Sequence, residues 1–167
     1  MDLNKLYKLQ EELDRHILEK NKAKISKEKL LDYTMLALLV EVGELANTTR
    51  CFKHWSKKGM MEKEIVLDEL ADVWHFYLSI GNQRGWDYKT QEPYLAIEEI
   101  NISDMFTSLY YNISRLSIAA SSRYNNYKDT GEDIFLLSQK LGFTDEEVEQ
   151  AYLTKHEENY KRQEGGY

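Results

Sequence analysis

Two acidic stretches decide how this chain folds: LALLVEVGELA at residues 36–46 and IVLDELADVWHF at residues 65–76. Each stretch carries two carboxylates three residues apart, Glu41 with Glu44 and Glu69 with Asp72. Side chains three residues apart on an α-helix point about 60° from one another around its axis, so each pair faces one patch of space. If both stretches are helical, each presents a pair of carboxylates on one face.

The surroundings of Glu41 are apolar on nearly every side of the expected helix, which predicts a buried helix. No lysine or arginine lies between Lys29 and Arg50 to neutralise it. An unpaired buried carboxylate is costly, so the pattern indicates a cation close to the acids. That cation is either a bound metal ion or a Lys or Arg from another helix. The simpler alternative is a solvated helix face, to which Glu62, Glu64 and Asp68 would belong.

The loop around residues 57–59 is short, and two helices joined by such a loop normally pack antiparallel. This arrangement brings the two acidic pairs face to face. Four facing carboxylates make an oxygen-rich cage, which is the ligand set that Mg²⁺ or Mn²⁺ prefers.

The rest of the chain predicts an all-α fold, because it contains one proline and long stretches of helical periodicity. We expect helices over residues 2–20, from 26 or 29 to 52, and over 61–83. A further helix opens over 92–101 and is followed or continued by 105–124. Residues 121–127 read as a loop, 133–141 as a short helix, and 144–163 as the last helix.

Composition limits the function. A chain of 167 residues fits one domain, and a net charge of −7 argues against a nucleic-acid partner. The single cysteine, Cys51, excludes an intrachain disulfide. The longest apolar run, residues 35–40, is too short to span a bilayer, and no signal peptide is visible. We therefore expect a soluble, cytoplasmic protein without a membrane partner.

The last helix has a polar stripe of its own. Thr144 and Glu147 form the spacing of a capping box, which predicts where this helix begins. Further along, Lys155, Asn159 and Arg162 share one face and could bind phosphate oxygens. The alternative is a solvated face with ion pairs along the helix, such as Glu158 with Arg162.

Three segments together resemble the dimeric, all-α dUTPase family, which is part of the MazG-like nucleotide pyrophosphatase superfamily. They are EVGELANTTRCFKHWSKK at 41–58, LDELADVWHFYLSIG at 67–81 and KHEENYKRQEGGY at 155–167. The acidic pairs are shared by the whole superfamily, whereas the segments around FKHWSKK and at the C-terminus are more specific. The resemblance implies one helical-bundle domain over residues 1–167, of about five to seven helices, with a helical insertion at about 87–145.

The resemblance also implies an activity: Mg²⁺-dependent hydrolysis of dUTP to dUMP and pyrophosphate by a homodimer. In this reading Glu41, Glu44, Glu69 and Asp72 hold the metal ions, with Mn²⁺ as a possible replacement. Glu44, or else Glu41, is the catalytic carboxylate that accepts a proton. The substrate-binding residues it implies are Gln10, Asp14, Trp55, Phe76, Lys155, Asn159 and Arg162.

Two positions depart from the family pattern. Asp14 stands where some members carry an amide, and Thr48 stands where an acid often follows the asparagine. His75 follows Asp72 by three residues, but a lone histidine on an apolar helix is usually a hydrogen-bonded core residue, so we leave it out of the metal site.

Three other functions are compatible with the pattern. The first is a broader pyrophosphatase acting on dCTP or modified nucleotides with the same four acids. The second is a ferritin-like di-iron bundle, which needs two Glu-x-x-His motifs where this chain approximates one. The third is a non-enzymatic helical module whose acids bind a basic partner.

Overall fold

The computed structural model describes residues 1–22, 24–89, 99–118 and 123–165. All regular secondary structure in these ranges is helical, which confirms the predicted fold class. The helices are α1 (Leu3–Lys20), α2 (Lys27–Thr49), α3 (Lys63–Arg84), α4 (Ile102–Ile118), α5 (Arg123–Lys140) and α6 (Asp145–Glu164).

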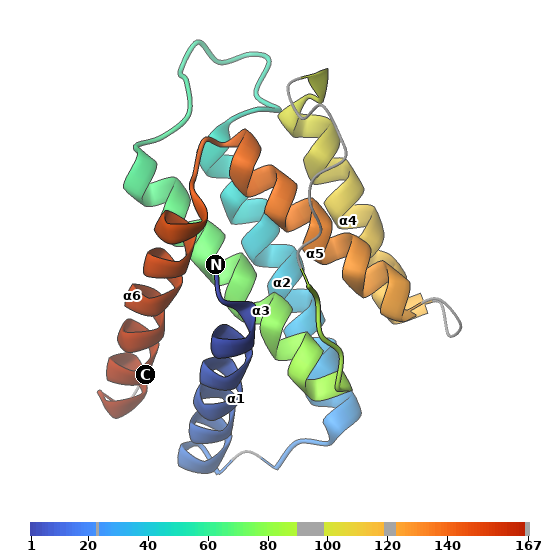
Figure 1. Ribbon diagram of the computed structural model, residues 1–167, viewed down its shortest axis with the longest axis vertical. Helices are drawn as coiled ribbons and strands as arrows, with labels where there is room; N and C mark the ends of the chain where they lie inside the picture. The colour runs from blue at the N-terminus through green and yellow to red at the C-terminus, as the bar shows by residue number, and fades with distance from the viewer. Residues whose placement is uncertain (23, 90–98, 119–122, 166–167) are drawn as a thin grey trace.

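Helix α3 lies at the centre of the bundle. It packs against α1, α2, α5 and α6 (Figure 1). Most of its second half is buried, and Trp74, Tyr77 and Leu78 are completely buried. A helix buried on most sides needs neighbours on those sides, and the other helices supply them. Polar side chains on the buried part of α3, such as His75 and Ser79, are therefore held in a well-packed frame.

Helix α2 runs antiparallel to α3, as the short connection predicts, but it is not buried on all sides. Its core-facing residues, such as Leu38, Val42 and Leu45, form a single stripe, while Leu36 and Val40 are 61% and 49% exposed. The expectation of a helix buried nearly all round was wrong. Helix α2 packs against α3 on its inner side and against α4 on one flank, so part of its apolar surface faces outward.

The ends of the helices largely follow local capping chemistry. The capping box of Thr144 and Glu147 is present, so the predicted start of α6 is confirmed. Helix α2 ends at Thr49 rather than at residue 52, because Arg50 takes a left-handed conformation with φ 56°. Helix α3 ends at Arg84 and is capped by Gly85, whose φ of 67° suits glycine.

The predicted loop over residues 121–127 was wrong for residues 123–127, which begin helix α5. The polar composition of this segment suggested a loop, but Tyr127 is fully buried. Its ring stacks on that of Tyr77, with 4.4 Å between the ring centroids. The hydroxyl of Tyr127 also lies 2.7 Å from that of Tyr7, so α5 is tied to α1 as well as α3. The predicted short helix at 133–141 is the second half of α5.

Part of the expected helix at 92–101 lies outside the described residues. Helix α4, which overlaps the predicted helix at 105–124, pairs with α5 on the opposite side of the bundle from α1 and α6 (Figure 1). The division into one domain with a helical insertion at 87–145 stays a prediction.

Gly81→Ala is expected to destabilise the protein. A methyl group there would lie 2.2 Å from the hydroxyl of Tyr127 and 2.8 Å from the backbone oxygen of Trp86. Overpacking of this kind costs about 1–3 kcal/mol, which exceeds the gain from replacing a helical glycine. Urea unfolding measures the change. Gly59→Ala is the control, since nothing lies within 4 Å of its added methyl group; equal effects of the two substitutions would contradict the prediction.

Candidate metal and nucleotide site

Three of the four predicted acids meet between α2 and α3. Oxygens of Glu41, Glu69 and Asp72 all lie within 4.8 Å of one another, and all three side chains are partly buried. Glu41 comes from α2 and the other two from successive turns of α3, so antiparallel packing of the two helices creates the cluster. We call these three residues the acidic triad.

The fourth acid, Glu44, is exposed and stands outside the triad. It still acts on the triad electrostatically, since its charge contributes to raising the pKa of Glu41 and of Glu69. Its place is therefore at the open rim of the cluster.

The triad is electrostatically strained without a counter-charge. Burial is the largest cause of the raised pKa of Glu41, about 7, and repulsion from Asp72, Glu44 and Glu69 adds to it. Burial also raises the pKa of Glu69 and of Asp72. A divalent cation would offset both the burial and the repulsion. The donor set, carboxylate oxygens from two helices within one ion's reach, fits Mg²⁺ or Mn²⁺.

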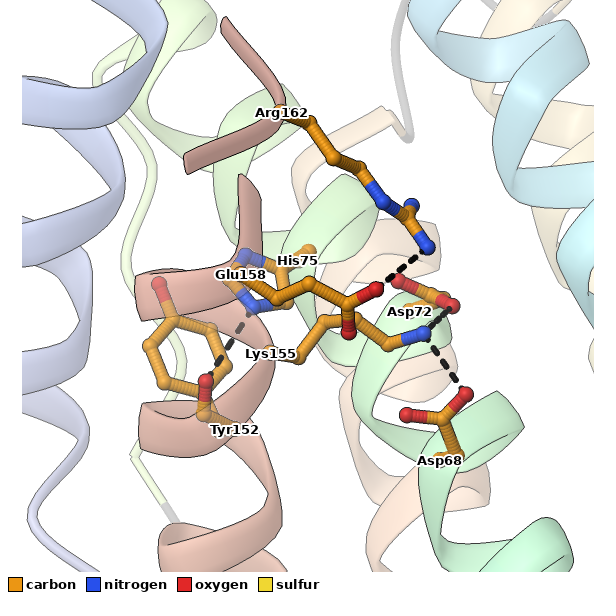
Figure 2. A network of polar contacts seen from close by, with 7 residues as sticks. All are labelled: Asp68, Asp72, His75, Tyr152, Lys155, Glu158 and Arg162. Atoms are coloured by element: carbon orange, nitrogen blue, oxygen red, sulfur yellow. Dashed lines mark hydrogen bonds and ion pairs between the residues drawn. The ribbon is translucent and has the colours of Figure 1, made fainter. Parts of the chain in front are cut away.

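A lysine from α6 reaches into the triad. The ammonium of Lys155 lies 2.7 Å from an oxygen of Asp72 and 2.7 Å from an oxygen of Asp68, one turn earlier on α3 (Figure 2). Only 4% of the Lys155 side chain is exposed. Burial lowers its pKa, but the hydrogen bonds to both aspartates outweigh this and raise it, so the ammonium is charged at neutral pH.

A cleft of about 310 Å³ opens along α3 beyond the triad. Asp72, Phe76, Ser79 and Gln83 are spaced at i, i+4, i+7 and i+11, so one face of α3 leads from the acids into the cleft. The cleft combines apolar and polar walls contributed by α1, α2 and α3. Its lining residues are Glu11, Asp14, Ile17, Leu18, Leu30, Thr34, Phe76, Ser79, Asn82 and Gln83.

Asp14 is held rigidly at the wall of this cleft. Gln10 donates to one of its oxygens at 2.7 Å and Ser79 donates to the other at 2.6 Å. Burial raises the pKa of Asp14 to about 6, although these two hydrogen bonds oppose the shift. The carboxyl group therefore has a fixed orientation in the wall of the cleft.

Gln10 connects Asp14 to His75. The side-chain oxygen of Gln10 accepts from the hydroxyl of Tyr152 at 2.9 Å and lies 2.6 Å from Nδ1 of His75. Burial lowers the pKa of His75 to about 3, so the ring is neutral. The other ring nitrogen faces the backbone oxygen of Tyr152 at 3.3 Å. The prediction that His75 is a hydrogen-bonded core residue is confirmed.

Other predicted residues lie outside the cleft wall. Trp55 is 68% exposed in the α2–α3 connection, where its ring contacts those of Phe52 and His54. Arg162 pairs with Glu158 at 2.7 Å, as the solvated-face alternative expected. Asn159 is half-buried on the same helix.

Sequence reasoning missed four polar residues of the site. Ser79 and Gln83 share the face of Asp72 and Phe76, and that spacing could have identified them. The side-chain nitrogen of Gln83 lies 2.9 Å from the hydroxyl oxygen of Thr34 and 3.2 Å from that of Ser79. Asp68 was expected on the solvent-exposed side of α3. It contacts Lys155, and no local sequence pattern predicts that contact.

The described residues form a helical bundle with a carboxylate triad beside a largely apolar cleft, an arrangement that fits a helical hydrolase. The profile of a family described as dUTPase matches residues 2–167. The chain belongs to this dUTPase family and hydrolyses dUTP to dUMP and pyrophosphate. A search of curated proteins found no match.

Asp14→Asn is expected to change how stability depends on pH. The folded protein binds a proton at Asp14 more tightly than the unfolded chain, whose aspartate pKa is about 3.9. The free energy of unfolding contributed by Asp14 therefore falls as pH rises from about 4 to about 6. Asparagine does not titrate, so the variant should gain stability relative to the wild type over that range, by up to about 3 kcal/mol.

Urea unfolding at several pH values between 4 and 7.5 measures this difference. A difference between variant and wild type that stays constant across the range would contradict the raised pKa.

Proposed function

We propose that dUTP hydrolysis in this protein depends on divalent metal ions, Mg²⁺ or alternatively Mn²⁺, held by Glu41, Glu69 and Asp72 with Glu44 completing the set. The observation that carries this proposal is the gathering of three carboxylates from two helices within 4.8 Å. Family members generally need a divalent metal, which supports the same assignment.

The bound metal would supply charge neutralisation of the triphosphate and activation of a water molecule. The protein's own residues do the rest. Glu44, at the open rim, is the candidate that accepts the proton of the attacking water, and Glu41 is the second candidate. The low exposure of the triad keeps bulk water from screening these charges.

We assign the nucleoside to the cleft along α3. Phe76 offers an apolar ring to the base, and Gln10 holds Asp14, whose carboxylate accepts an N–H of the base or a hydroxyl of the sugar. Because Phe76 stands one helical turn from Asp72, a base in the cleft would direct its phosphates towards the triad.

We assign the phosphates to one face of α6. Lys155 reaches the triad, and Asn159 and Arg162 follow it at i+4 and i+7. Trp55 lies in the α2–α3 connection, at the end of α3 opposite to the base cleft, so we do not assign its ring to a base bound there.

A broader substrate range is the second candidate. Asp14 has a carboxyl group where an amide could both donate and accept. A carboxylate only accepts, which suits the 4-amino group of cytosine as well as the N3–H of uracil. This observation favours dCTP as the additional substrate to examine.

We propose that the protein is a cytoplasmic homodimer without nucleic-acid or membrane partners. The exposed apolar side chains of Tyr33, Leu36 and Val40 on α2 support a protein contact there. The net charge of −7 supports the lack of nucleic-acid binding. No described helix combines the length and apolar character needed to cross a membrane.

Release of pyrophosphate from dUTP, dCTP, dTTP and UTP with Mg²⁺ tests the nucleotide assignment. We expect kcat/KM for dUTP to exceed that for UTP and dTTP by at least about tenfold, because dTTP adds a 5-methyl group to the base and UTP adds a 2′-hydroxyl to the sugar, and one such added group is typically worth about 10–200-fold. The value for dCTP should lie between them. Equal rates on all four would contradict the assigned base cleft.

Glu41→Gln is expected to lower kcat by about 10²-fold or more, because it removes a carboxylate oxygen from the triad while keeping its shape. The measurement is steady-state dUTP hydrolysis over a range of Mg²⁺ concentrations, with circular dichroism to check the fold. Glu64→Gln, an exposed acid on α3, is the matched control and should retain activity. Equal activity of both variants would remove Glu41 from the site.

A further inference from the structure

The ion pair between Lys155 and Asp72 places a cation where the proposed metal ion needs a ligand. The ammonium touches an oxygen of Asp72, which is also a member of the triad. A divalent ion at the triad and an ammonium 2.7 Å from the same carboxylate repel each other. Asp72 therefore cannot bind the metal ion and the Lys155 ammonium at full strength at the same time.

Asp68 gives the ammonium a second partner. It lies 2.7 Å from the ammonium, but it is not part of the triad and its side chain is 56% exposed, against 18% for Asp72 (Figure 2). The ammonium can therefore give up Asp72 and keep Asp68. Because the rest of the Lys155 side chain is buried, the ammonium stays beside the triad when it does so.

We infer that Lys155 and the metal ion compete for Asp72, and that Asp68 is the positioning residue which retains the ammonium beside the site once the metal has taken that carboxylate. From there the ammonium faces the phosphate oxygens that the metal brings in. This inference rests on the proposed metal-binding role of the triad, and it adds a role for Asp68.

Removal of the Lys155 ammonium is expected to strengthen the binding of Mn²⁺ alone and to weaken the binding of the nucleotide. Lys155→Met should bind Mn²⁺ alone about tenfold more tightly than the wild type, because its competitor is gone. The same variant should bind the non-hydrolysable analogue α,β-imido-dUTP with Mn²⁺ more weakly, because a phosphate contact is lost. A merely structural lysine would weaken both.

Titration calorimetry with Mn²⁺, in the absence of nucleotide, measures the first effect. Lys161→Met, which removes an exposed charge from the same helix, is the matched control and should change Mn²⁺ affinity little. Lys155→Gln is a second variant for the case in which Lys155→Met disturbs folding. It also removes the charge, but its amide can still donate a hydrogen bond to an aspartate.

A double-mutant cycle tests Asp68. Asp68→Asn should weaken Mn²⁺ binding severalfold in the wild-type background, because the displaced ammonium loses its remaining partner. In the Lys155→Met background the same substitution should have no more effect than Glu64→Gln, a charge loss one turn away. A pure charge effect of Asp68 would instead be equal in both backgrounds.

Unchanged or weaker Mn²⁺ binding by Lys155→Met and Lys155→Gln would overturn the inference, as would an Asp68→Asn effect that is equal in both backgrounds. The proposed function fails differently. If the wild type shows no Mn²⁺ binding that Glu41→Gln removes, the triad is not the metal site, and the inference falls with it.

Discussion

Crowding of negative charge is the constraint on which the site depends. The bundle brings three carboxylates within 4.8 Å of one another in a partly buried position, where burial and mutual repulsion disfavour ionisation. Such a cluster is stable only if positive charge accompanies it. Among the described residues, the ammonium of Lys155 contacts Asp72 directly and Arg162 adds positive charge near it, and the proposed divalent cation would supply the rest.

Helix α3 connects the acidic triad with the cleft. Its packing against α1, α2, α5 and α6 fixes Glu69 and Asp72 at one end and the face of Phe76, Ser79 and Gln83 further along. The central helix thus sets the separation between the proposed base cleft and the proposed phosphate site. The surrounding helices complete each end, with α1 bringing Asp14 to the cleft and α6 bringing Lys155 to the acids.

The acidic pairs could be predicted because their spacing on a helix is a local property. The same holds for the capping box of α6 and for His75 as a hydrogen-bonded core residue. The loop assignment of residues 123–127 failed because polar composition was taken for exposure. Tyr127 is polar at one atom and apolar elsewhere, and its burial depends on Tyr7 and Tyr77, which are distant in the sequence.

The sequence by itself determined the all-helical class, the antiparallel pairing of α2 with α3, and the kinds of ligand that this pairing presents, because these follow from periodicity and from a short connection. Only the tertiary structure decided that Glu44 stands at the rim, that α2 leaves Leu36 exposed, and that Asp68 and Asp72 share Lys155. These features depend on how helices far apart in the chain pack. Asp68 and Lys155 are separated by 87 positions in the sequence, so no local pattern indicates their contact.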